Sequence, residues 1–358
     1  MVEADPAKRA FGRPSLSPRI ALCWRQLKLL RMMPTVDRTL AHRRLLRRIH
    51  GVPAEAASHV INFPPLAQLL SSAYRRGLEK HRASLPKLSD TESRIVAGLR
   101  RDGVVVTSLQ ALALSGTGKM LSSAAELMDV YAGRAARGEF RHRYTTLVSG
   151  DELMQHPSIP WWGLDQSLLR IAEAYLGLPV AYDGCHFYYT VADGRQVASR
   201  LWHRDFEDRR MVKVTVYLHD VDDGGGPYEI LHRDFPGSQS LSGFNYPILT
   251  HEELAQRLGG AIDDRDVTSC TGPAGTVIFS DPATRYHRGK PAVSRDRAAI
   301  FYNYFSRRPL RPFLCERSGL SRAQLASLAT GLSPAQRACL LWRDDLPWIA
   351  KLIPPAPL

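Results

Sequence analysis

The sequence predicts a mainly β core, built as a sandwich or jelly roll, with a helical lead before it and a helical tail after it. From Pro179 onward, short runs of alternating or β-branched residues are separated by turns rich in Gly and Pro, and little helical sequence lies between them. Before about residue 103 and again in the tail, apolar residues recur at steps of three and four, the period of an amphipathic helix.

Helices are expected along the lead, at the start of the core and in the tail. The first five are predicted over Pro18–His50, Leu66–Arg82, Asp90–Arg101, Ser122–Tyr131 and Gln166–Leu176. Ser89 or Asp90 is an N-cap candidate for the third of them, and Glu92 follows at capping-box spacing. The tail returns to helix over Ser321–Leu358, with Ser333 and Pro334 as a helix start.

Strands are expected after the turn at Asp102 and Gly103. They are predicted over Val104–Val106, Val180–Ala181, Cys185–Val191, Ser199–His203, Met211–His219, Tyr228–Leu231, Gly275–Ser280 and Arg297–Phe305. Met211–His219 alternates clearly, with valines at alternate positions on one face and Lys213, Thr215 and Tyr217 on the other. The polar face of this strand is therefore a candidate pocket wall.

Positive charge is concentrated at the N-terminus. The 358-residue chain has a formal net charge of +13, and residues 1–50 hold twelve Lys and Arg against three Asp and Glu. Such a basic segment either binds nucleic acid, a membrane surface or an acidic partner, or is a solvated helix face. No RNP, zinc-finger or helix-turn-helix signature is present, so nucleic-acid binding is not expected.

Other bulk features exclude several classes of protein. No apolar run of 18 residues exists, and no secretory segment is recognised, so we expect a cytoplasmic protein without a membrane span. The five cysteines (Cys23, Cys185, Cys270, Cys315 and Cys339) are widely spaced, which favours reduced thiols over disulfides or a zinc site. No phosphate-binding loop of the GxxxxGK[ST] type is present.

The pair His203 and Asp205 is a candidate for two ligands of a metal ion. On a strand, residues i and i+2 point to the same side, so an imidazole and a carboxylate could face one ion. A non-heme iron site takes two histidines and one carboxylate and leaves open positions for reactants. Among the other histidines, His287 remains after those in helical segments and beside turns are set aside; it follows the strand Gly275–Ser280. Taken alone, His203 reads equally as a solvent-exposed or hydrogen-bonded histidine.

A longer motif surrounds this pair. The run SRLWHRDFEDRRMVKVTVYLHDVDDGGGP, followed later by GTVIF, by HRG at His287 and by an arginine that opens a strand, resembles the phytanoyl-CoA dioxygenase-like family of Fe(II)/2-oxoglutarate-dependent oxygenases. The resemblance covers roughly Arg94–Arg308. It implies a double-stranded β-helix, the cupin-like jelly roll, over residues 94–310. A basic helical extension over 1–93 and a helical tail over 311–358 would then flank it.

The resemblance also implies roles for particular residues. His203, Asp205 and His287 match the iron ligands, and Arg297 matches the arginine that binds the distal carboxylate of 2-oxoglutarate. A planar guanidinium suits this task, because it can donate two parallel hydrogen bonds to a carboxylate. Arg295 is a close competitor, since it lies on the same side of the chain.

One neighbouring residue departs from the family pattern, and another has two possible roles. A hydroxyl residue often lies two positions after the distal histidine, where this chain has Gly289, so another hydroxyl must substitute: Tyr217, Thr215 or Tyr188. Lys213 either pairs with a 2-oxoglutarate carboxylate or faces solvent.

Further pocket candidates follow from side-chain parity. Asn303 shares the parity of Arg297 and could face the cofactor, and Tyr217 is a second cofactor candidate. Tyr188 and Arg210 are candidates for substrate contacts. Trp202 is a pocket candidate that we expect to brace the metal site from behind, since it points away from His203.

The function implied is that of a dioxygenase that uses Fe(II), 2-oxoglutarate and O2 to hydroxylate an unactivated C–H bond of a small molecule, with release of succinate and CO2. Positive charge favours an anionic substrate. The aspartate argues against halogenation, because related halogenases replace it with a small residue. One alternative is a catalytically silent protein of this fold that acts as a basic interaction module. Another is a cupin-like metalloenzyme without 2-oxoglutarate, for which Arg297 would serve no purpose.

Overall fold

The computed structural model describes residues 50–232 and 248–356. The helix predicted over Pro18–His50 and the basic segment 1–50 lie outside these ranges except for His50, as does Cys23. In the described part of the chain the other four cysteines are buried free thiols, and no helix is long and apolar enough to cross a membrane.

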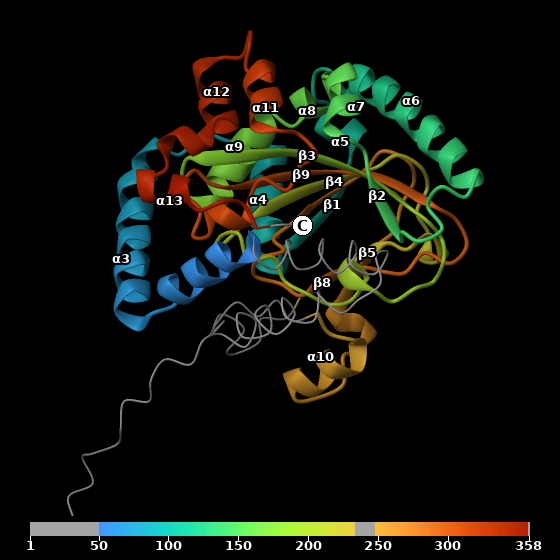
Figure 1. The fold of residues 1–358 in the computed structure, drawn as a ribbon, viewed down its shortest axis with the longest axis horizontal. Coiled ribbons are helices and arrows are strands. Elements are labelled where there is room, and N and C mark those ends of the chain that lie inside the picture. The colour runs from blue at the N-terminus through green and yellow to red at the C-terminus, as the bar shows by residue number, and fades with distance from the viewer. Residues whose placement is uncertain (1–49, 233–247, 357–358) are drawn as a thin grey trace, which may run out of the picture.

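Two antiparallel sheets form the centre of the molecule (Figure 1). The larger sheet has the strand order β1-β7-β4-β9-β3-β2, and the smaller has the order β6-β5-β8. The strands are β1 (Val104–Ser108), β2 (Thr145–Leu147), β3 (Val180–Thr190), β4 (Val212–Tyr217), β5 (Tyr228–Leu231), β6 (Val267–Cys270), β7 (Thr276–Ser280), β8 (His287–Gly289) and β9 (Arg297–Ser306). Neighbours in each sheet lie far apart in the sequence, so both sheets depend on long-range pairing.

The predicted β core is present as two antiparallel sheets, but helices hold more of the described residues than strands do, which is more helix than the sequence indicates. Residues 50–61 are helical. The α-helices that follow are α3 (Pro64–His81), α4 (Asp90–Asp102), α5 (Leu109–Leu112), α6 (Thr117–Ala136), α7 (Gly150–Gln155), α8 (Ser158–Trp162), α9 (Gln166–Leu176), α10 (His251–Leu258), α11 (Arg322–Leu328), α12 (Pro334–Leu340) and α13 (Trp348–Leu352). Much of the excess lies between β1 and β3, where α5 to α9 connect the strands and the sequence predicts only two helices.

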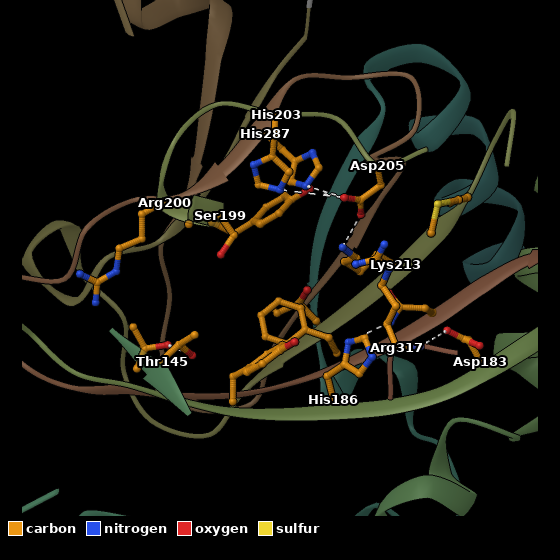
Figure 2. Close-up of a pocket in the computed structure, with 18 of the residues that line it drawn as sticks. Thr145, Asp183, His186, Ser199, Arg200, His203, Asp205, Lys213, His287 and Arg317 are labelled. Atoms are coloured by element: carbon orange, nitrogen blue, oxygen red, sulfur yellow. Dashed lines mark hydrogen bonds and ion pairs between the residues drawn. The ribbon is translucent and has the colours of Figure 1, made fainter. Parts of the chain in front are cut away.

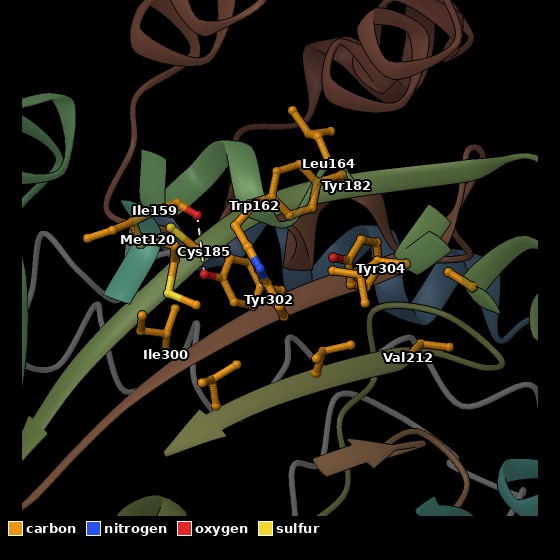
Figure 3. Packing of buried hydrophobic residues seen from close by; sticks show 14 of the residues in the cluster. Met120, Ile159, Trp162, Leu164, Tyr182, Cys185, Val212, Ile300, Tyr302 and Tyr304 are labelled. Carbon is orange, nitrogen blue, oxygen red and sulfur yellow. Dashed lines mark hydrogen bonds between the residues drawn. The ribbon is translucent and has the colours of Figure 1, made fainter. Parts of the chain in front are cut away.

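The helices bury one face of the larger sheet. On β4, Val212, Val214 and Val216 enter the main hydrophobic core, as their alternation predicted. Beneath α8, Tyr182, Tyr302 and Tyr304 turn their rings into the same core and donate their hydroxyls to backbone carbonyls of residues 159–163 (Figure 3). These bonds satisfy buried polar groups that would otherwise destabilise the fold. The opposite face of the sheet is left to line a cavity.

Most predicted elements are present, and the capping signals are accurate. Ser89 and Glu92 form a capping box at the start of α4, and Ser333 caps α12. The two strands predicted near residue 185 are one strand, β3, with a bulge between Tyr182 and Cys185. Ser199–His203 is not a strand: it begins with a 3-10 turn, η3 (Ala198–Arg200), and then makes single bridges.

Candidate metal centre and its cavity

His203, Asp205 and His287 form a buried group of ligand atoms between the two sheets. The two histidines face each other in an antiparallel bridge, in which His203 N donates to His287 O at 3.0 Å and His287 N donates to His203 O at 2.9 Å. Asp205 N donates to Pro282 O at 2.9 Å. Backbone pairing therefore brings together residues that lie 84 positions apart in the sequence.

Each imidazole is oriented by its Nδ1 atom. His203 Nδ1 lies 2.8 Å from Leu201 O, and His287 Nδ1 lies 3.4 Å from Arg285 O. A proton on Nδ1 leaves Nε2 unprotonated, as a metal ligand requires. The Nε2 atoms lie 3.9 Å (His203) and 3.8 Å (His287) from Asp205 Oδ1 (Figure 2). Two ligands bound to one ion at about 2.1 Å each can be at most about 4.2 Å apart, so both of these distances are compatible with a shared ion. All three ligand atoms lie within 4.8 Å of one another.

Electrostatics keeps these groups in the ligand-competent state. Burial lowers the pKa of both His203 and His287, so the imidazoles stay neutral. Burial alone would raise the pKa of Asp205, but the charge and the hydrogen bond of Lys213 act against it, and that pKa lies below its usual range. Lys213 Nζ donates to Asp205 Oδ2 at 2.6 Å, which leaves Oδ1 for the ion. Metal binding needs this protonation pattern.

A cavity of about 290 Å³ adjoins the three ligands and is lined by both sheets. Figure 2 shows Thr145 and Arg200 at one end, Asp183 and Arg317 at the other, and the His-Asp-His group between them. Thr145 pairs with Thr190, which in turn pairs with Arg297, so Arg297 belongs to the first end. His203, Asp205 and His287 thus lie in the cavity wall between these two ends.

Of the two candidates Arg297 and Arg295, Arg297 is the one that faces this cavity. It is buried, it lines the wall, and its guanidinium has no hydrogen bond or ion pair within the described residues. Arg295 is exposed and pairs with Asp222 at 2.9 Å, outside the cavity. Gly289 explains the missing hydroxyl residue, because a Cβ at this position would lie 3.0 Å from Arg297 Nη2. The glycine leaves room for the guanidinium.

The polar residues predicted to form the pocket wall do line the cavity, and some of their polar groups are hydrogen-bonded within the protein. Tyr217 donates its hydroxyl to Cys270 O and accepts from Tyr228 N, both at 2.9 Å, and so joins the two sheets. Thr215 Oγ1 is buried without a hydrogen-bond partner, and Tyr188 also lines the wall. Asn303 Nδ2 lies 3.2 Å from His186 Nδ1. Lys213 faces the cavity, where Asp205 is its partner.

Two predicted pocket residues do not line the cavity. Trp202 is fully buried in a separate cluster with Leu231, Leu254 and Tyr286, with Arg288 above its ring, so it braces the site from behind. Arg210 is exposed and lies over the ring of Tyr175. The guanidinium of Arg210 therefore lies at the protein surface, in the turn before β4.

Several lining residues escaped the sequence analysis: His186, Glu207 and Arg317, together with Asp183 and Arg200. The alternation of β3 could have indicated His186, since it shares parity with Tyr188. Arg317 lies in the tail, beyond the motif, and no sequence signal connects it to the cavity.

No family model and no curated protein matches the chain. Solved structures do. EctD from S. alaskensis with 2-oxoglutarate and 5-hydroxyectoine is 20% identical, with a TM-score of 0.44, over 70% of this chain and 89% of EctD. HygX from Streptomyces hygroscopicus with iron bound is 16% identical, with a TM-score of 0.40, over 62% and 88% of the two chains.

The epimerase SnoN, in complex with Fe3+, alpha ketoglutarate and nogalamycin RO, is 17% identical, with a TM-score of 0.40, over 68% of this chain and 92% of SnoN. At such TM-scores the likeness by itself supports no conclusion about the function of this chain. What the structure itself shows is the buried group of His203, Asp205 and His287, the three residues that the motif predicts as metal ligands.

Proposed function

We propose that the chain is a dioxygenase that uses Fe(II), 2-oxoglutarate and O2 to hydroxylate an unactivated C–H bond of a small molecule. A double-stranded β-helix over residues 94–310 would form its core, with the lead 1–93 and the tail 311–358 packed on it. The observation that carries the proposal is one cavity with two features: three converging ligand atoms and, at one end, a buried arginine without a counterion.

In this proposal His203, Asp205 and His287 hold the iron, and Arg297 binds the distal carboxylate of 2-oxoglutarate. A buried guanidinium strongly favours a carboxylate partner, since its desolvation is otherwise uncompensated. Lys213 holds Asp205 in place through Oδ2. When bound, iron and 2-oxoglutarate would supply an oxidant, with succinate and CO2 as co-products.

Arg297 also separates this function from the alternatives. A cupin-like metalloenzyme that does not use 2-oxoglutarate has no need of a buried cation facing the metal group. A catalytically silent interaction module has no need of three oriented ligand atoms, which cost stability when they are buried without a metal. The basic segment of such a module lies outside the described residues.

Anaerobic reconstitution with Fe(II) and 2-oxoglutarate tests the proposal. We expect a weak visible charge-transfer band that is absent in His203→Ala and in His287→Ala. The control is His142→Ala, since His142 is exposed and lies outside the cavity. No band in the wild type, or an unchanged band in the two ligand variants, would refute the proposed iron site.

A further inference from the structure

The cavity has a second end, which 2-oxoglutarate cannot occupy if Arg297 binds it. Arg297 and Asn303 both face the cavity from β9, and they lie six positions apart, so their Cα atoms are separated by about 20 Å. A five-carbon diacid that reaches from Arg297 to the metal group leaves the Asn303 end open. Lys213 lies opposite Asn303 in the sheet, and Glu207 and Arg317 lie beyond it in the cavity wall.

Arg317 lies at this second end, and the edge of its guanidinium formed by the two Nη atoms makes no hydrogen bond within the described residues. Its Nε donates to Leu314 O at 2.6 Å and lies 3.5 Å from Glu207 Oε1. Its two Nη atoms have no hydrogen-bond partner among the residues that the structure describes. The side chain is 33% exposed, so part of Arg317 is in contact with solvent. The end-on pair of Nη groups can bind a carboxylate or phosphate through two parallel bonds.

The chain holds Arg317 in place through a feature of β3. The bulge between Tyr182 and Cys185 turns Asp183 toward the tail, where its carboxylate accepts the backbone N–H groups of Glu316 at 2.8 Å and Arg317 at 3.2 Å. Gly184, with φ of +85°, lets the tail approach: a Cβ there would lie 2.8 Å from Ser318 Oγ. Bulges commonly redirect side chains beside functional sites.

Two buried polar atoms without a hydrogen-bond partner in the described part of the chain belong to residues of the same cavity wall. His186 Nε2 and Asn303 Oδ1 are both buried without a hydrogen-bond partner, although both residues line the cavity. Burial holds the pKa of His186 at about 3, so the ring is neutral and contributes hydrogen bonding and no charge. Buried polar atoms without partners are uncommon and indicate that a ligand or water completes the site.

We propose that Arg317 anchors an anionic group of the substrate, a carboxylate or a phosphate, at the end of the cavity opposite Arg297. This inference rests on the proposed function, because it assigns the first end to 2-oxoglutarate. The C–H bond to be oxidised would then lie between the metal group and Arg317, within one small molecule. The tail, outside the predicted oxygenase core, would determine the substrate class.

Binding of defined anions to the enzyme loaded with Fe(II) and saturating 2-oxoglutarate under anaerobic conditions tests the proposal. The probes are straight-chain and aryl carboxylates and phosphate monoesters, each paired with its neutral amide or alcohol. We expect at least one anion to bind about tenfold or more tightly than its neutral partner. The carboxylate and phosphate arms distinguish the two kinds of anion.

Variants show whether Arg317 causes this preference. Arg317→Gln should abolish it with 2-oxoglutarate affinity unchanged, and Arg317→Lys should retain part of it. Arg337→Gln, an exposed arginine on α12, should behave as the wild type. A wild type without an anion preference, or a preference that survives Arg317→Gln, would overturn the inference. Failure of the wild type to bind 2-oxoglutarate would count instead against the proposed function.

Discussion

Arg297 and Arg295 are separated by two positions and share a chemistry, but their surroundings differ completely. Arg297 is buried, faces the cavity and has no counterion in the described part of the chain, whereas Arg295 pairs with Asp222 on the surface. An exposed ion pair contributes little, so its loss should be silent. A buried guanidinium in contact with a carboxylate should contribute strongly to ligand binding.

Arg297→Ala should therefore raise the dissociation constant of 2-oxoglutarate by about 10- to 100-fold, because the distal carboxylate loses charged hydrogen bonds. Arg295→Ala is the matched control and should leave the constant unchanged. Titration of the anaerobic Fe(II) enzyme with 2-oxoglutarate measures both. If Arg295→Ala had the larger effect, the assignment of the carboxylate partner would be wrong by two residues.

At the scale of single residues, the sequence predicts what side-chain parity and motif spacing determine. The polar face of β4, the position of Trp202 behind His203 and the grouping of His203, Asp205 and His287 all follow from alternation or from the motif. Arg317 could not be predicted in this way. Its place depends on a hydrogen bond between Asp183 and a distant segment, and such tertiary contacts leave no local pattern.

At the scale of elements, the bulge in β3 links the sheet to the tail segment that carries Arg317. Gly184→Ala should disturb it twice, since alanine is strained at φ of +85° and its Cβ would collide with Ser318. Gly116 is a matched control, because it has φ of +75° and nothing lies near its Cβ position.

Thermal unfolding of both variants separates strain from collision. Gly116→Ala should cost about 1–2 kcal/mol of stability through strain alone. Gly184→Ala should cost more and should also weaken the anion preference ascribed to Arg317, because the tail must shift. Equal losses in the two variants, with the anion preference intact, would show that the bulge does not position the tail.

Elements differ in how well the sequence predicts them. Helices with capping boxes, such as α4 and α12, begin where their caps indicate, because the capping bonds are local. Strands β2, β6 and β8 have three or four residues each and were not predicted. Their existence depends on partners far along the chain, as β8 shows by pairing with β5. Short strands of this kind have too few residues for a recognisable period.

At the scale of the whole molecule, the tail is part of the core and not an appendage. Leu325, Leu328 and Leu340 are buried in the main hydrophobic cluster beneath the larger sheet. Trp342 is buried in a second cluster, where its ring centroid lies 5.1 Å from that of Phe305 on β9. The tail beyond residue 310 therefore shares its hydrophobic clusters with the strands.

Deletion of the tail and deletion of the lead should have opposite outcomes. A chain that ends at residue 310 loses several buried side chains whose single truncation typically costs about 2–5 kcal/mol each, and their sum exceeds the total stability of an ordinary domain. We expect this chain not to fold, as judged by loss of a cooperative thermal transition. A chain that begins at residue 50 retains every residue that lines the cavity.

The shorter lead should therefore leave Fe(II) and 2-oxoglutarate binding within about twofold of the full chain, a difference of less than 0.5 kcal/mol by the usual relation between affinity and free energy. Anaerobic titration of the two chains, side by side, measures it. A large loss of binding would mean that the basic segment 1–49 contributes to the site. Unchanged cofactor binding with a weakened preference for anionic probes would instead assign the segment's positive charge to substrate attraction, whose dependence on salt concentration would then confirm long-range electrostatics.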